Sequence, residues 1–228
     1  MGEETGIELP SERVGIVPSE AWKKKAKNEA WLPGETISAS IGQGYVNVTP
    51  LQMATLIRTV PNDGVMFRPR LVQAVMDRAT GEFQQRSVVP KRTLNLRPGI
   101  LPLIKEALAG VVKEGTGTRA QSALVTIGGK TGTAQMTALR SGPEKDIPKK
   151  FRDHAWFVAF APVEAPTIAV AVLGEHMGHG GSASAPLAKE LIETYVKLSL
   201  PTPSGVTDGA VAREGDAGGR ERDDRPGD

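Results

Sequence analysis

The 228-residue chain has no cysteine, few aromatic residues and no long apolar run. The absence of cysteine excludes disulfides, thiolate metal ligands and thiol nucleophiles, and it fits a reducing or an oxidising compartment equally well. The longest apolar stretches, residues 155–163 and 168–173, are far shorter than the roughly 18 to 20 residues that cross a bilayer. Residues 1–12 are polar and acidic, so this chain shows neither a membrane span nor a secretory signal.

A strong excess of charge is missing as well. The formal net charge is +2 and 24% of the residues are charged, which is ordinary for a globular domain and does not favour nucleic-acid binding. The length and the 39% hydrophobic content allow one domain with a sizeable core. Residues 201–228 are rich in Gly, Pro, Asp and Arg, so we expect a disordered tail after a domain that spans residues 1–200.

Helical signals come early in the chain. Thr49 and Pro50 form a strong helix start, and Pro61 should end that helix. A second helix is predicted over residues 100–113, where apolar residues recur at helical spacing before a glycine turn. The apolar residues predicted to lie on one face of the first helix are Leu51, Ala54, Leu56 and Ile57.

Strand signals follow the helices. Residues 125–127 lead into a glycine-rich stretch, and residues 155–161 and 167–173 predict a buried antiparallel hairpin. Residues 185–198 predict a closing helix that packs on this sheet. Its predicted packing residues are Leu187, Leu191, Ile192, Tyr195 and Val196. Helices, then strands, then a covering helix indicate an α+β fold.

The segment richest in chemical groups is Gly-Gly-Lys-Thr-Gly-Thr-Ala-Gln at residues 128–135. Lys130, flanked by glycines and hydroxyl side chains, offers positive charge and approachable backbone N–H groups to a carboxylate or an oxyanion. A phosphate-binding loop is excluded because Leu124 stands where that motif requires glycine. Taken alone, Lys-Thr-Gly also fits an exposed edge strand with a solvated lysine.

Further motifs accompany this segment in order. They are Thr-Gly-Ile-Glu-Leu-Pro at 5–10, Trp-Leu-Pro-Gly-Glu-Thr at 31–36, Ser-Ile-Gly-Gln-Gly at 40–44 and Asp-His-Ala-Trp-Phe at 153–157. With them, the chain resembles the class B penicillin-binding proteins, and most closely the elongation-type penicillin-binding protein 2 group. This resemblance implies the C-terminal part of a penicillin-binding, serine β-lactamase-like transpeptidase domain, which is α+β and incomplete here.

The resemblance implies cell-wall crosslinking by serine acyl transfer, with peptidoglycan stem peptides as substrates and β-lactams as inhibitors. Lys130 would hold positive charge in the cleft, while the hydroxyls of Thr131 and Thr133 would bind the terminal carboxylate. The Thr133 backbone N–H would be an oxyanion-hole donor. Gly132 would leave room for the substrate, and Gln135 completes the substrate-binding stretch.

The resemblance implies neither a cofactor nor a metal. It places the parent protein at the periplasmic face of the inner membrane, with membrane proteins of the elongation complex as partners. His176 and His179 have the spacing of a metal-binding helical face, but the surrounding glycines indicate a loop with no third ligand. The basic segment 22–27 is predicted to be a solvated helical turn, with contact to membrane headgroups as the alternative.

The sequence contains no Ser-x-x-Lys and no Ser-x-Asn. Thr194–Lys197 and Tyr45–Asn47 imitate these motifs, but the first lies in the closing helix and the second in a structural stretch of the family. In the family the nucleophile precedes the Thr-Gly-Ile stretch, so we expect it upstream of Met1. Two alternatives remain open: a non-catalytic module that binds stem peptides or a cell-wall partner, and one half of a split enzyme. Whether this chain itself is an enzyme is therefore open.

Overall fold

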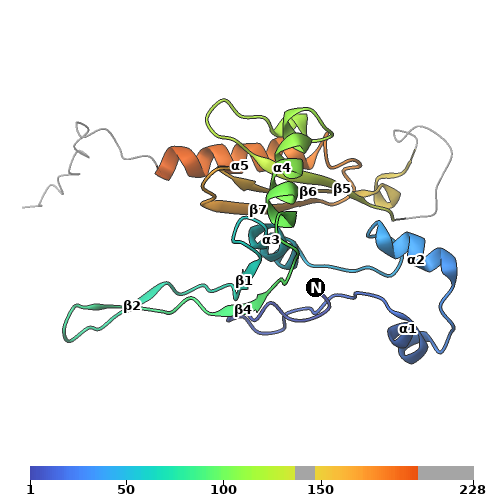
Figure 1. The fold of residues 1–228 in the computed structure, drawn as a ribbon, viewed down its shortest axis with the longest axis horizontal. Helices are drawn as coiled ribbons and strands as arrows, with labels where there is room; N and C mark the ends of the chain where they lie inside the picture. The colour runs from blue at the N-terminus through green and yellow to red at the C-terminus, as the bar shows by residue number, and fades with distance from the viewer. Residues whose placement is uncertain (137–146, 200–228) are drawn as a thin grey trace, which may run out of the picture.

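A computed structural model describes residues 1–136 and 147–199 of the chain (Figure 1). Its centre is a three-stranded antiparallel sheet in the order β5-β6-β7. The strands are β5 (Gly128–Ala134), β6 (His154–Ala161) and β7 (Ile168–Gly174). The two later strands confirm the predicted hairpin, and β6 is almost fully buried because its aromatic and small apolar residues are covered on both faces.

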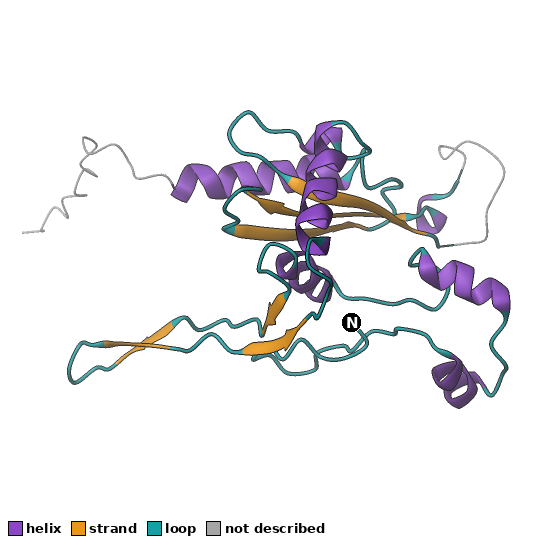
Figure 2. Cartoon of the chain, in the orientation of Figure 1, coloured by secondary structure: helices purple, strands orange, loops and turns teal. Residues whose placement is uncertain are grey.

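Helices cover both faces of this sheet (Figure 2). On one face, α5 (Ser184–Ser199) packs through Ile192 against a cluster that contains Phe157. On the other face, α3 (Pro50–Thr59) contributes Ile57 to a cluster that contains Phe160. The two aromatic rings point to opposite faces because successive strand residues alternate. The architecture confirms the predicted α+β class.

The closing helix is confirmed, but most of its predicted packing face is wrong. Ile192 is buried and Val196 is packed against the same cluster, whereas the side chains of Leu187 and Leu191 are 42% and 54% exposed. The buried face instead carries the small residues Ala185 and Ala188. Small side chains let α5 approach the sheet closely. A prediction that assigns the buried face from the largest apolar residues does not find this.

The first predicted helix begins and ends as expected. Thr49 caps α3 by accepting a hydrogen bond from the backbone N–H of Gln52, and the helix ends before Pro61. Of its predicted apolar residues, Ile57 is buried and the others are half-buried, while polar residues fill the remaining buried positions. Thr55 and Thr59 donate their hydroxyls to backbone carbonyls four residues earlier, so they are buried without loss of hydrogen bonding. The buried residues of α3 are Gln52, Thr55, Ile57 and Thr59.

The second helix, α4 (Ile100–Lys113), matches its prediction. The strand predicted over residues 125–127 is wrong, because the glycine-rich segment itself forms β5. Four short strands that the sequence pattern does not predict lie between α3 and α4. They are β1 (Val65–Phe67), β2 (Ala74–Met76), β3 (Phe83–Gln85) and β4 (Pro90–Thr93), paired as β1-β4 and β2-β3. The β2-β3 ribbon projects away from the sheet (Figure 1).

Two helices precede α3, namely α1 (Glu20–Lys27) and α2 (Pro33–Ser40). The prediction of a solvated basic turn is wrong for Lys23, which is buried. Its ammonium lies 2.6 Å from a carboxylate oxygen of Glu35 and 3.4 Å from one of Glu29. This ion pair joins α1 to α2. The described residues also contain two short 3-10 helices, η1 (Thr118–Ala120) and η3 (Lys149–Phe151).

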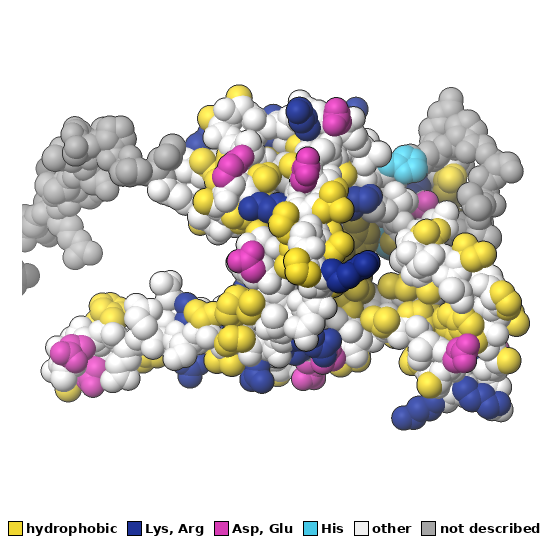
Figure 3. Space-filling view, in the orientation of Figure 1, with side chains coloured by type: hydrophobic (Ala, Val, Ile, Leu, Met, Phe, Trp, Pro, Cys, Tyr) yellow, Lys and Arg dark blue, Asp and Glu magenta, His cyan; other side chains and the backbone are white. Residues whose placement is uncertain are grey.

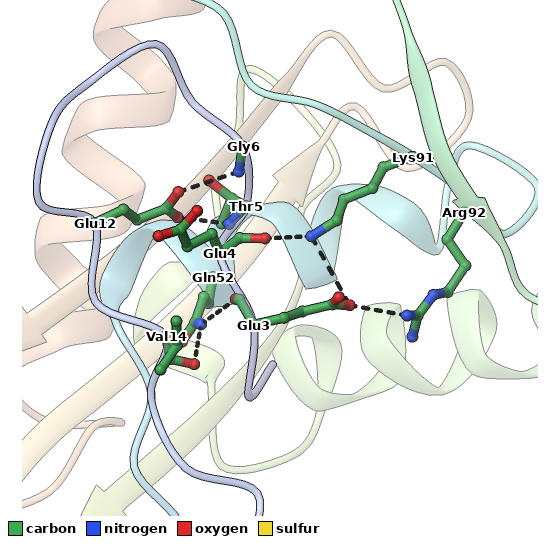
Figure 4. Close-up of polar contacts among 9 residues, drawn as sticks. All are labelled: Glu3, Glu4, Thr5, Gly6, Glu12, Val14, Gln52, Lys91 and Arg92. Carbon is green, nitrogen blue, oxygen red and sulfur yellow. Dashed lines mark hydrogen bonds and ion pairs between the residues drawn. The ribbon is translucent and has the colours of Figure 1, made fainter.

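Polar contacts also fix the N-terminal segment on α3 and β4 (Figure 4). The side-chain amide of Gln52 donates to the carbonyls of Glu3 and Val14, at 2.9 and 2.8 Å. The carboxylate of Glu3 lies 2.9 Å from the guanidinium of Arg92. The segment therefore lies against the body although it adds no apolar side chain to the buried core.

The predicted tail over residues 201–228, and with it the domain boundary at residue 200, lies outside the described residues. Among the helices of residues 1–136 and 147–199, none is long and apolar enough to cross a membrane. Apolar side chains are nonetheless prominent on the surface, including on α2 (Figure 3). Ile37 and Ile41 on and just after this helix are 70% and 72% exposed.

Candidate functional site

The candidate site is built on β5. This strand pairs with β6 along its whole length, with Gly128 opposite Phe160 and Ala134 opposite His154. A Cβ atom on Gly128 would lie 2.8 Å from the Phe160 ring, and one on Gly129 would lie 2.8 Å from the Phe157 ring. The paired glycines therefore let the aromatic rings of β6 pack directly against the β5 backbone. They fix the strand from which the next residues reach a ligand.

One edge of β5 is open, because β5 is the outer strand in the sheet order of the described chain. The carbonyl of Thr133 faces this edge, since it accepts a hydrogen bond from the Gln43 side chain at 2.8 Å. In an antiparallel strand the N–H and C=O of one residue point to the same side, and so do those of the residue two positions away. The backbone groups of Thr131 and Thr133 therefore face the same edge, where an extended ligand can pair with them.

Lys130 brings positive charge to this edge. Its ammonium donates to the carbonyl of Thr131 at 2.8 Å, and its side chain is exposed. Strand alternation places Lys130 and Gly132 on the α3 face of the sheet, and Thr131 and Thr133 on the α5 face. The ammonium therefore bends around the strand edge toward the threonines. The predicted residues meet at an edge and do not share one face.

Gly132 and Gln135 have further contacts. A Cβ atom on Gly132 would lie 3.2 Å from the Cβ of Trp156, and one on Gly180 would lie 2.6 Å from the Gly132 carbonyl. Gly132 is thus packed between β6 and the loop before α5, which adds a packing reason to its predicted role. The backbone N–H of Gln135 donates to the Gln43 side chain at 3.4 Å.

Gln43 is a site residue that the sequence pattern does not identify. Its side-chain amide bonds to backbone groups of Thr133 and Gln135, as a neighbouring strand would, and so it ends the open edge. Gly42 and Gly44 on either side adopt left-handed conformations with φ of 76° and 71°. A lone amide between two glycines was the signal available in the sequence.

Thr116 was also missed. The turn between α4 and η1 places its hydroxyl 2.8 Å from the hydroxyl of Thr131. The sequence pattern predicts only a turn here, from its glycines. The open part of the β5 edge is therefore bounded by Thr116 on one side and by Gln43 on the other.

The other candidate segments named from the sequence do not reach this edge. Asn47 pairs with Ile16 through two backbone hydrogen bonds, of 2.7 and 2.9 Å. His176 lies in a loop after β7, as predicted, and its ring centroid is 4.6 Å from that of His154. Residues 1–136 and 147–199 contain no cluster of three or more metal-ligating side chains. A cavity of about 740 Å³ between α4 and residues 121–127 is lined by none of the β5 residues.

The sequence matches the family described as penicillin binding protein transpeptidase domain over residues 1–193. The chain belongs to this family. The peptidoglycan D,D-transpeptidase MrdA of Acinetobacter baumannii is 38% identical over 207 residues, which are 89% of this chain and 30% of the relative. The protein of the same name from Haemophilus influenzae is 34% identical and covers 88% of this chain and 32% of the relative.

Solved penicillin-binding proteins share the fold. Pseudomonas aeruginosa PBP2 in complex with WCK 5153 has a TM-score of 0.71 at 32% identity, covering 93% of this chain and 44% of that one. Helicobacter pylori PBP2 in complex with MreC has a TM-score of 0.70 at 30% identity, covering 87% and 34%. These relatives confirm the PBP2-type class B assignment. The chain spans about a third of the length of the curated relatives it matches.

Proposed function

We propose that this chain supplies the substrate-binding strand of a peptidoglycan D,D-transpeptidase. One observation carries the proposal: the open edge of β5 gathers the ammonium of Lys130, the hydroxyl of Thr131 and the backbone of Thr133. An ammonium and hydroxyls suit a terminal carboxylate, and a free strand edge suits an extended peptide. A stem peptide that ends in D-Ala-D-Ala presents both groups.

The reaction proposed for the parent protein is acyl transfer in two steps. A serine oxygen bonds to the carbonyl carbon of the penultimate D-Ala, the amide C–N bond breaks, and the terminal D-Ala leaves with the serine proton. An amine of a neighbouring stem then bonds to the same carbon, the ester C–O bond to the serine breaks, and a proton of the amine is transferred to the serine oxygen. The 228 residues contain no Ser-x-x-Lys, so we propose that the serine comes from sequence outside them.

The β5 residues have distinct proposed roles in that reaction. Lys130 attracts the terminal carboxylate, and Thr131 and Thr133 donate hydroxyl hydrogen bonds to it. The backbone N–H of Thr133 stabilises the oxyanion that forms at the attacked carbonyl, a contact typically worth about 3 kcal/mol of barrier. Gly132 keeps the strand close to β6, and Gln135 completes the stretch through its contact with Gln43.

Location and partners are proposed from the relatives. We propose that residues 1–200 are part of a transpeptidase domain, with residues 201–228 as a separate tail. The parent protein would work at the periplasmic face of the inner membrane and bind β-lactams at the same edge. The complex of the Helicobacter pylori relative with MreC supports partners in an elongation complex.

An NMR titration tests the proposal. The isotope-labelled full chain is titrated with a blocked peptide that ends in D-Ala-D-Ala. Chemical-shift changes should centre on residues 130–135. Thr131→Val and Lys130→Ala should each weaken binding by roughly tenfold or more, because each removes a contact to a charged group. Two exposed residues outside β5 give matched controls, Thr167→Val and Lys149→Ala, which should bind as the unaltered chain does.

Shifts that avoid β5, or equal binding of an L-Ala-L-Ala peptide, would contradict the proposal. Binding without acylation is also what a non-catalytic stem-peptide module would show. The absence of Ser-x-x-Lys favours that second candidate for the chain alone. Addition of a polypeptide that carries the family's serine motif separates the two, because only a transpeptidase part would then support acylation.

A further inference from the structure

The backbone around Thr116 is tightly fixed. The N–H of Gly115 donates to the carbonyl of Gly110 at 3.1 Å, and the N–H of Gly117 donates to that of Val111 at 2.9 Å. A Cβ atom on Gly181 would lie 2.3 Å from the Thr116 carbonyl. Thr116 is therefore held between the end of α4 and the loop before α5, and its hydroxyl contact with Thr131 follows from a well-packed turn.

The contact between the two hydroxyls restricts where their protons can point. Each hydroxyl has one proton, and in the 2.8 Å contact either oxygen can be the donor. A carboxylate only accepts hydrogen bonds. When a carboxylate lies against Thr131, the single proton of Thr131 must point to the ligand. Thr116 must then donate its own proton to the Thr131 oxygen.

We infer that Thr116 is a positioning residue for the carboxylate of the peptide or β-lactam bound at β5. Its hydroxyl donates to Thr131 and holds the Thr131 proton toward the ligand, and the two hydrogen bonds polarise each other. This inference rests on the proposed function and adds to it. Thr116 acts through Thr131, so its effect depends on the ligand's carboxylate.

Two peptides test this dependence: a blocked D-Ala-D-Ala peptide with a free C-terminal carboxylate, and the same peptide with a C-terminal amide. The quantity measured is the ratio of their dissociation constants for the full chain, from NMR titration. The unaltered chain should prefer the carboxylate. Thr116→Val should reduce this preference roughly fivefold, because one hydrogen bond that orients the Thr131 proton is lost.

Three further variants separate positioning from a structural effect. Thr116→Ser keeps the hydroxyl and should restore the preference. Thr118→Val, at an exposed threonine that begins η1 two residues later, should leave it unchanged. In a Thr131→Val background, Thr116→Val should have no additional effect, since the hydroxyl it orients is gone.

The outcomes are distinct. If the unaltered chain prefers the carboxylate and Thr116→Val keeps the full preference, the inference is wrong while the proposed function stands. If Thr116→Val weakens both peptides equally, its role is structural and the inference is again wrong. If the unaltered chain shows no preference for the carboxylate, the proposed function fails and the inference fails with it.

Discussion

The sheet and the N-terminal region of this protein are stabilised in different ways. Around β5–β7 the largest fully buried side chains include Phe157, Phe160 and Ile192, all at 0% exposure. In and against the N-terminal region the buried side chains include Lys23 and Gln52, which form ion pairs and hydrogen bonds. Large apolar side chains around α2 and along the β2-β3 ribbon are instead exposed. They are Leu32, Ile37 and Ile41 around α2, and Leu71, Val75, Met76 and Phe83 in or beside the ribbon.

This contrast distinguishes the interactions that stabilise the sheet from those that position the N-terminal region. Apolar burial gives the sheet most of its stabilisation, whereas a single hydrogen bond adds only about 0.5–1.5 kcal/mol net but fixes direction. We therefore expect the N-terminal region to open before the sheet does. Its exposed apolar side chains form a surface suited to contact with further protein, which fits the proposal that sequence outside these 228 residues completes the site.

The largest effect should come from the sheet. Phe157→Ala removes a fully buried ring that packs against both Gly129 and the α5 cluster, and it should cost about 3–5 kcal/mol of unfolding free energy in a urea titration. Phe83→Ala provides the contrast, because this ring is 68% exposed on the β2-β3 ribbon. A similar loss in both variants would mean that burial does not distinguish the two regions.

A smaller and local effect should follow from Gln52→Ala. The variant leaves the carbonyls of Glu3 and Val14 without their donor, which should cost about 1–3 kcal/mol. Hydrogen exchange should become faster in residues 1–16, while β6 amides keep their protection. Equal acceleration in β6 would show that the two regions unfold as one unit.

The ion pair between α1 and α2 should make stability depend on pH. Hydrogen bonding to Lys23 lowers the pKa of Glu35, and hydrogen bonding to Glu35 raises the pKa of Lys23. The contribution of Glu35 is therefore present above the ordinary glutamate pKa of about 4.3 and lost as pH falls through the lowered value. That of Lys23 is present below the ordinary lysine pKa of about 10.4 and lost at higher pH.

Lys23→Met should accordingly lower the urea midpoint at pH 7 and have less effect at pH 3. The neighbouring Lys24 is exposed, so Lys24→Met should match the unaltered chain at both values. A Lys23→Met effect that stays constant between pH 7 and pH 3 would show that lost packing, and not the ion pair, accounts for it.

The smallest effect on stability should come from Gln43→Ala, at the boundary between the two regions. Global stability should change by less than about 1 kcal/mol, since one partly buried amide is lost. Exchange of the Gln135 amide should nevertheless become faster, because Gln43 accepts its hydrogen bond. Gln84→Ala on the exposed β3 strand is the control. Unchanged exchange at Gln135 would show that Gln43 does not close the β5 edge in solution.

Much of the sheet and of the helices that cover it could be predicted from the sequence. The hairpin, α4, the cap and end of α3, and the closing helix all follow from local patterns, which act over a few residues. The buried faces of α3 and α5 could be predicted only in part, because Thr55, Thr59 and Ala188 are buried through their particular partners. The short ribbons between α3 and α4 lack a strong strand pattern and depend on pairing across distant positions.

The candidate site was also predictable only in part, because local patterns identify some of its residues and long-range contacts place the others. Residues 130–135 lie together on one strand, so a local motif identifies them. Gln43 reaches the site across 90 positions of sequence, and Thr116 depends on how a turn packs against the loop before α5. Contacts of this kind arise from the tertiary fold, and one sequence read alone does not specify them.

Labelling with a fluorescent penicillin tests the central claim most directly. The purified chain, a Lys130→Ala variant and a denatured sample are incubated with the reagent and analysed by intact mass. We predict no covalent adduct on any of them, because the 228 residues carry the proposed ligand-binding strand but no Ser-x-x-Lys nucleophile. A stoichiometric adduct on the folded chain that is lost in Lys130→Ala would contradict the account, since one of its own hydroxyls would then be acylated.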